Sequence, residues 1–86
     1  MVYTFEKSTR VNKKYMTTYQ GRTIHFGDKR YDHFFDKIGL YSNQNHNDEK
    51  RRRAYLKRAK SIKDKNGNLT YLDPSSPNYY SVNLLW

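Results

Sequence analysis

The chain has 86 residues, of which 35% are hydrophobic and 16% aromatic, and it carries a formal net charge of +9. This length allows one hydrophobic core, and the aromatic and β-branched residues along most of the chain argue against disorder. Without cysteine a disulfide, a thiolate zinc site or a cysteine nucleophile is excluded, and no apolar stretch is long enough to span a bilayer. We therefore expect one small basic domain over residues 1–86 that does not insert into a membrane.

The N-terminal part of the chain predicts a three-stranded antiparallel meander. Three segments are rich in residues that favour strands: residues 2–6, 13–19 and 22–26. Gln20-Gly21 predicts a tight turn, and Gly27 can adopt the positive φ of a sharp exit from the sheet. Whether residues 1–12 pair in this sheet or hang free stays open.

A first helix is predicted from Asp28 to Gly39. Its apolar residues have the i, i+3, i+4, i+7 spacing of one helical face: Tyr31, Phe34, Phe35 and Ile38. Asp28 is a favourable N-cap, and Gly39 suits the position that follows a helix.

A second helix is predicted over residues 48–63, with Asn47 as its N-cap and two acids in its first turn. It carries an apolar stripe that we expect to dock on the sheet: Tyr55, Ala59 and Ile62. Residues 65–68 then predict a turn, and residues 69–72 a short extended piece.

Ser76-Pro77 predicts the N-cap and first residue of a last short helix. The predicted fold class is therefore α+β, a small three-stranded antiparallel meander packed by two or three short helices. The aromatic end of the chain either closes the core, which we favour, or docks on a partner through three anchor residues: Tyr79, Tyr80 and Trp86.

The positive charge is concentrated in residues 50–65, which hold nine Lys or Arg against one acid. Seven cations of this helix form what we call the basic ridge: Lys50, Arg51, Arg52, Arg53, Lys57, Arg58 and Lys60. A charged run is often only a solvated face, but repulsion among like neighbours three and four apart destabilises a helix unless an anion lies against it. We predict a polyanionic partner, either the acidic surface of another protein or the phosphate backbone of DNA or RNA.

Six side chains could ligate a metal or exchange protons: His25, Asp28, Asp32, His33, Asp36 and His46. Their spacing matches no zinc or EF-hand pattern. No nucleophile elbow, Gly-rich phosphate loop or base-reading motif occurs either. We therefore expect no enzyme, no metal, no cofactor, no small-molecule substrate and no sequence-specific base reading.

Three motifs in order carry a resemblance to a known family. They are residues 23–28 (Thr-Ile-His-Phe-Gly-Asp), the basic block 50–59, and the ending 73–86. Together they resemble a family of small basic proteins of large nucleocytoplasmic double-stranded DNA viruses, including algal and giant viruses, over residues 13–86. Many members have Arg-His where this chain has Arg58-Ala59-Lys60, so a role of that histidine does not transfer, and no activity is carried over to single residues.

The resemblance implies a viral setting, with the protein in the virion after synthesis in the host cytoplasm or nucleus. Our first hypothesis is a virion structural protein, a minor capsid or capsid-associated component that binds acidic surfaces of the viral capsid or of other proteins. The alternative is a nucleic-acid-binding protein that contacts the phosphate backbone without sequence preference.

Overall fold

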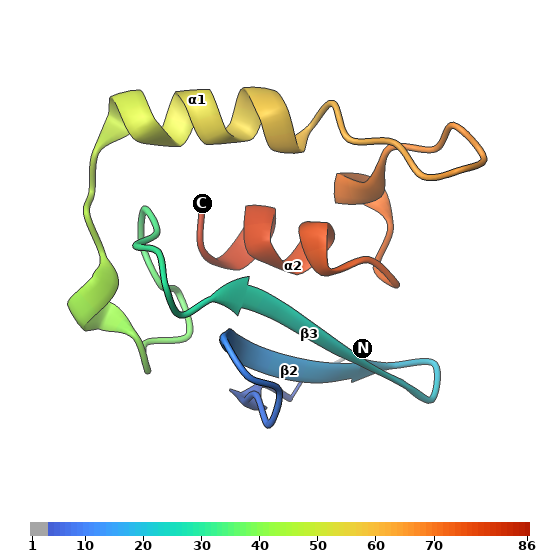
Figure 1. Ribbon diagram of the computed structural model, residues 1–86, viewed down its shortest axis with the longest axis horizontal. Helices are drawn as coiled ribbons and strands as arrows, with labels where there is room; N and C mark the ends of the chain where they lie inside the picture. Colours follow the sequence, from blue (N-terminus) through green and yellow to red (C-terminus); the bar gives the residue numbers. More distant parts are fainter. Residues whose placement is uncertain (1–3) are drawn as a thin grey trace.

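The computed structural model describes residues 4–86, which form a three-stranded antiparallel sheet and four helical segments (Figure 1). The strands lie in the order in which they follow one another along the chain: β1 (Glu6–Lys7), β2 (Lys13–Tyr19) and β3 (Arg22–Asp28). The helical segments are two α-helices and two short 3-10 helices: η1 (Ser42–Gln44), α1 (Glu49–Ala59), η2 (Thr70–Leu72) and α2 (Pro77–Leu84). The predicted α+β fold with a three-stranded meander is confirmed.

The hairpin between β2 and β3 closes through a two-residue turn. Gln20 and Gly21 have φ values of 49° and 77°, the geometry whose twist matches that of the paired strands. Tyr19 pairs with Arg22 directly across the turn. The predicted tight turn is confirmed, and β3 continues to Asp28, two residues beyond its predicted end.

The first strand is shorter and later than predicted. β1 has two residues, which pair with Met16 and Tyr15 of β2 and complete the meander at its edge. Part of the segment before residue 12 therefore joins the sheet. The prediction covered residues 2–6, of which residues 2 and 3 lie outside the described part of the chain.

An aromatic core fills the space between the sheet and α2. Its buried members come from β2, β3 and the end of the chain: Tyr15, Ile24, Phe26, Tyr80 and Leu85. The Phe26 ring stacks on Tyr15 at 5.6 Å and on Tyr80 at 5.4 Å between centroids. Such aromatic pairs add about 0.5–1.5 kcal/mol each beyond the area they bury. The C-terminal segment thus closes the core, as we favoured.

α2 is the middle layer of the molecule. Figure 1 shows α1 and α2 side by side and running in opposite directions, with the sheet on the other side of α2. The predicted docking of the α1 stripe on the sheet is therefore wrong, because α2 already covers the sheet with larger apolar side chains. Ala59 is buried, whereas Tyr55 stacks on Trp86 and Ile62 lies beyond the helix, 51% exposed.

Asp28 is the last residue of β3, and residues 29–39 form turns, bends and one isolated bridge, so the helix predicted over residues 28–39 is wrong. A helix needs each amide to bond the carbonyl four residues back, but the Phe35 amide donates instead to the Leu85 carbonyl at 3.1 Å. Tyr31 and Phe35 are 65% and 48% exposed, so the helical spacing of apolar residues does not mark a buried face.

α1 is shorter than its predicted range of 48–63, since it ends at Ala59. Its N-cap is Asp48, whose carboxylate accepts two backbone N–H groups of the first turn. Asn47, the predicted cap, lies outside the helix with φ of 53°. Because Asp48 is the cap, a negative side chain lies at the positive end of the helix dipole.

The connection after α1 agrees with the sequence in part. Residues 65–68 form the predicted turn, closed by an antiparallel bridge between Lys63 and Leu69. The extended piece predicted over residues 69–72 is instead the 3-10 helix η2.

α2 begins as predicted, with Ser76 as N-cap and Pro77 at the first helical position. Proline suits this position because its missing N–H would have no partner within the helix. The Asn78 side chain then donates to the Ala59 carbonyl at 2.8 Å and ties α2 to the end of α1. Neither helix of residues 4–86 has the length and apolar character needed to cross a bilayer.

Gly27 is a position where any side chain should be costly. Its φ is +76°, and an added Cβ would lie 3.0 Å from Leu85 Cδ1 and 3.1 Å from Lys14 Cβ. Gly27→Ala should lower the free energy of unfolding by about 2–4 kcal/mol, since backbone strain and overpacking add. Urea denaturation measures this loss.

Gly21→Ala is the matched control, because φ there is +77° but nothing lies within 4 Å of the added Cβ. Strain alone should lower its free energy of unfolding by about 1–2 kcal/mol. Equal losses in the two variants would show that the close approach at Gly27 has no energetic weight.

Candidate functional site

Six of the seven residues of the basic ridge are exposed, and Arg52 is half-buried. Within residues 4–86 the ridge makes one ion pair, between Arg52 Nη1 and Glu49 Oε2 at 3.5 Å. The six exposed members have no carboxylate of the described chain within ion-pair distance. They present uncompensated positive charge to the solvent.

Arg52 serves the fold. Its Nε donates to the Trp86 backbone carbonyl at 2.8 Å, and its guanidinium lies 5.1 Å from the centroid of the Phe34 ring. Arg52 therefore holds the end of the chain against α1, and six residues of the basic ridge remain available to a partner.

The three predicted anchors are used inside the molecule to different degrees. Tyr80 is 1% exposed and its hydroxyl donates to the Pro74 carbonyl at 2.5 Å, so a partner does not reach it. Trp86 is half-buried and stacks on Tyr55, with centroids 4.0 Å apart and ring planes 10° apart. Tyr79 is half-buried with its ring edge against Tyr80.

A cleft of about 740 Å³ opens beside α1, lined across from the helix by the end of β3 and the segment that follows it. Its lining includes four cationic side chains: Lys14, Arg30, Arg51 and Arg58. Arg51 and Arg58 are seven residues apart, or about two helical turns, so the basic ridge contributes one face of α1 to the cleft. This volume is within the range of about 300–1,000 Å³ typical of ligand pockets.

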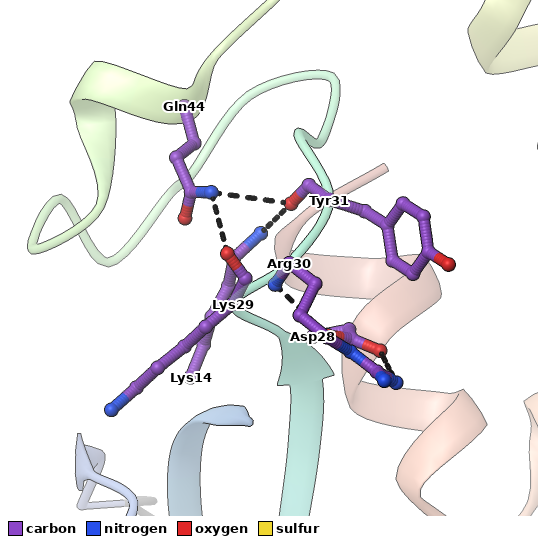
Figure 2. Close-up of polar contacts among 6 residues, drawn as sticks. All are labelled: Lys14, Asp28, Lys29, Arg30, Tyr31 and Gln44. Carbon is purple, nitrogen blue, oxygen red and sulfur yellow. Dashed lines mark hydrogen bonds and ion pairs between the residues drawn. The ribbon is translucent and has the colours of Figure 1, made fainter. Parts of the chain in front are cut away.

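Two acids also line the cleft, and one of them is neutralised locally. Arg30 donates to both carboxylate oxygens of Asp28, at 3.1 and 2.9 Å (Figure 2). These hydrogen bonds, the largest influence on the group, lower the pKa of Asp28 to about 2. Asp32 is exposed and has no ion-pair partner among the described residues. The cleft therefore keeps an excess of positive charge.

Lys14 is a buried lysine at the base of this site, only 1% exposed. Figure 2 shows Lys14 Nζ and Gln44 Nε2 converging on the Tyr31 carbonyl, at 2.9 and 3.4 Å. Lys14 Nζ also lies 2.7 Å from His33 Nδ1. Burial lowers the pKa of Lys14, and the nearby carboxylates of Asp32, Asp36 and Asp28 oppose this shift.

His33 is buried and held in one tautomer by its neighbours. Because the Lys14 ammonium only donates, His33 Nδ1 accepts, and the proton on Nε2 is donated to Asn45 Oδ1 at 2.6 Å. Burial and the Lys14 charge both lower the pKa of His33, while the Asn45 contact and the carboxylates of Asp36 and Asp32 raise it. His33 is therefore a neutral acceptor for the buried ammonium.

Asp36 ties the irregular segment to β2. Its carboxylate accepts a short hydrogen bond from the Tyr15 hydroxyl, and it accepts the amides of Ile38 and Tyr41 at 2.8 Å each. Burial alone would raise the pKa of Asp36, but these hydrogen bonds together hold it below its usual value. Burial and the same contact raise the pKa of Tyr15.

The structure separates the six metal-capable residues into different environments. Four of them line the cleft: Asp28, Asp32, His33 and His46. Asp36 is buried in the segment that follows β3. His25 lies in β3 outside the cleft, with its Nδ1 2.7 Å from Ser8 Oγ. Nowhere in residues 4–86 do three or more His, Asp or Glu side chains gather in a way that could hold a metal ion.

The sequence analysis missed Lys14 as a member of this site. Neighbouring residues of a strand point to opposite faces of the sheet. Because Tyr15 faces the core, the preceding Lys14 is expected to point to the other face and into solvent. Its ammonium contacts Tyr31 and His33 of the irregular segment after β3, and no local pattern in the sequence predicts these contacts.

One family matches most of the chain. The Family of unknown function (DUF5754) matches residues 3–59. The chain belongs to this family. The DUF5754 match runs from the sheet to the last residue of α1, so it contains every cationic residue of the cleft. No curated protein and no solved structure matches the chain.

The pKa of His33 predicts a pH dependence of stability. The group takes up a proton near pH 6.5 in the unfolded chain but not in the folded one, because its folded pKa is lower. The contribution of neutral His33 to the free energy of unfolding should therefore be fully present above about pH 6.5. It should be lost as the pH falls through the folded pKa. Urea denaturation between pH 8 and 5 measures this slope.

In His33→Gln that slope should be smaller, although the variant is less stable at every pH. A parent protein whose stability does not change between pH 8 and 5 would contradict the buried neutral state of His33.

Asp36→Asn should lower the free energy of unfolding at pH 7 by about 2–4 kcal/mol, because one acceptor becomes a donor that faces other N–H groups. The carboxylate stabilises the fold above its unfolded pKa, and this contribution is lost as the pH falls through the lower folded pKa. The variant should therefore lose stability less steeply than the parent between pH 5 and 2 in thermal denaturation. Glu6→Gln, which neutralises an exposed acid of β1, should behave like the parent.

Proposed function

We propose that the protein is a non-catalytic binding protein that holds the phosphate backbone of a nucleic acid along the exposed part of the basic ridge. The observation that carries this proposal is a set of six exposed cations, five on α1 and Lys60 at its C-cap, without a described carboxylate partner. Each phosphate contacted by such a cation releases condensed counterions, which supplies most of the affinity of sequence-independent binding.

The packing of the aromatic end favours phosphate over a protein surface. Protein interfaces draw most of their affinity from a few large side chains that fill pockets on the partner. Tyr80 is buried, and Trp86 stacks on Tyr55. The end of the chain therefore has little aromatic area left to offer as an anchor, whereas the cations remain accessible.

A second candidate is a minor capsid or capsid-associated protein that binds an acidic protein surface in the virion, after synthesis in the host cytoplasm or nucleus. Three large apolar side chains are about half exposed or more in the segment after β3: Tyr31, Phe35 and Leu40. Exposed apolar side chains close to a cationic surface suit a protein interface. The resemblance to proteins of large DNA viruses supports the same candidate.

For the first candidate, the logarithm of the association constant for DNA should fall linearly with the logarithm of salt concentration. Arg53→Ala and Lys57→Ala should each reduce the slope by about one unit and weaken binding alike on every sequence, as the loss of one phosphate contact does. Fluorescence anisotropy with two unrelated duplexes between 50 and 300 mM salt, roughly the range in which such slopes are resolved, tests this.

Lys65→Ala is the control, since it removes the same charge from an exposed position outside α1. It should leave the slope unchanged. An equal effect of all three variants would reduce the binding to net charge alone and contradict a role of the basic ridge.

Cross-linking of purified virus particles with a lysine-reactive reagent separates the two candidates. Lys50 and Lys57 on α1 and Lys60 at its C-cap are exposed and available to the reagent. Cross-links to shell proteins would favour the capsid candidate, and presence only in the DNA-containing core would favour the phosphate backbone.

A further inference from the structure

His46 carries a buried N–H group without an acceptor in the described chain. The Asp48 backbone N–H donates to His46 Nδ1 at 2.9 Å, so Nδ1 accepts and the ring proton lies on Nε2. Nε2 is shielded from solvent and has no hydrogen-bond partner within residues 4–86. A buried donor of this kind is unfavourable unless an acceptor comes to it.

The same residue lines the cleft beside α1, together with Arg51 and Arg58. Its ring is fixed there, since it packs at 5.2 Å from the Trp86 ring and at 6.2 Å from the Phe34 ring. The residue that carries the orphan donor therefore belongs to a cleft whose helical wall is cationic. An anion with hydrogen-bond-accepting oxygens satisfies both features.

The two acidic residues of the cleft do not neutralise all of its cationic residues, so positive charge remains for that anion. Asp28 is engaged by Arg30, and Asp32 is exposed. The cationic groups that line the cleft without an ion-pair partner are the guanidinium groups of Arg51 and Arg58, with the buried Lys14 ammonium and the His46 ring beside them. Planar guanidinium groups suit the oxygens of a phosphate, with which they form paired hydrogen bonds.

We propose that this cleft binds a phosphate monoester, namely the terminal phosphate of a nucleic-acid strand. A terminal phosphate carries up to two charges and three free oxygens, which matches several donors better than the two free oxygens of an internal phosphodiester. A cleft also suits a strand end, since an internal phosphate needs an exit on both sides. This inference rests on the proposed function, because the exposed part of the basic ridge holds the rest of the strand.

The test compares two oligonucleotides of one sequence, one with a 5′-phosphate and one with a 5′-hydroxyl group, each labelled at the 3′ end. At physiological salt the phosphorylated strand should bind roughly tenfold more tightly, the weight of one charge-assisted hydrogen bond. Arg58→Ala and Arg51→Ala should each reduce this preference. Arg53→Ala is the matched control, because it is exposed on α1 but does not line the cleft, and it should keep the preference.

The outcomes separate the two proposals. Equal affinity for the two strands, with the salt dependence retained, would overturn the terminal-phosphate site and leave the proposed function intact. Binding of neither strand at physiological salt would overturn both. A preference that survives Arg51→Ala and Arg58→Ala would also overturn the site.

A second measurement reads the orphan donor directly. Adding the phosphorylated strand should shift the His46 imidazole nitrogen and Nε2 proton resonances, while the hydroxyl strand should not. Adenosine 5′-monophosphate should cause the same shift more weakly, because it brings the phosphate without the strand. Saturation by the mononucleotide at the concentration that suffices for the strand would assign the cleft to free nucleotides and overturn the strand end as its occupant.

Discussion

The irregular segment that follows β3 depends on the hydrogen bonds of the buried Lys14 ammonium. The segment after β3 has no helix or strand of its own until η1, so its polar groups need partners elsewhere. Lys14 supplies a donor to the Tyr31 carbonyl and to His33, and Asp36 supplies acceptors to the backbone further along. Removing one partner of such a network leaves a buried group unsatisfied, which costs more than the hydrogen bond was worth. One wall of the cleft therefore rests on side chains that never contact the solvent.

The cations of this chain fall into two groups. Lys14 and Arg52 each bind a backbone carbonyl of the chain itself, and they hold the segment after β3 and the chain end in place. The exposed members of the basic ridge have no carboxylate partner among residues 4–86, and Arg53 contacts only the Glu49 carbonyl of its own helix. The net charge of +9 thus contains two kinds of cation. A few stabilise the fold through hydrogen bonds, and the exposed ones destabilise it by mutual repulsion. An anionic partner relieves that repulsion.

The sequence predicts the parts of this fold whose causes are local. The turn at Gln20-Gly21 follows from backbone preferences, and the start of α2 follows from a Ser-Pro pair. The helix predicted over residues 28–39 fails because its apolar spacing is matched by chance. Two of its amides bond to the carbonyls of Leu84 and Leu85, which are distant in the sequence, and the Asp36 amide bonds to the Asn45 side chain. The site follows the same rule: the basic ridge is visible as a charge run, whereas burial of Lys14 and the orphan N–H of His46 depend on tertiary contacts.

The layer order has a consequence for how the protein is made. α2 follows every other element in the chain, yet it lies between α1 and the sheet (Figure 1). Until it has been synthesised, the inner face of the hairpin and the inner face of α1 have no surface to pack against. Contacts between residues so far apart in the sequence form late, and they reduce the folding rate. The nascent chain should therefore keep its aromatic residues uncovered until α2 has emerged from the ribosome and then acquire its structure in a single step. Early engagement by a chaperone, or by the anionic partner itself, is favourable for such a chain.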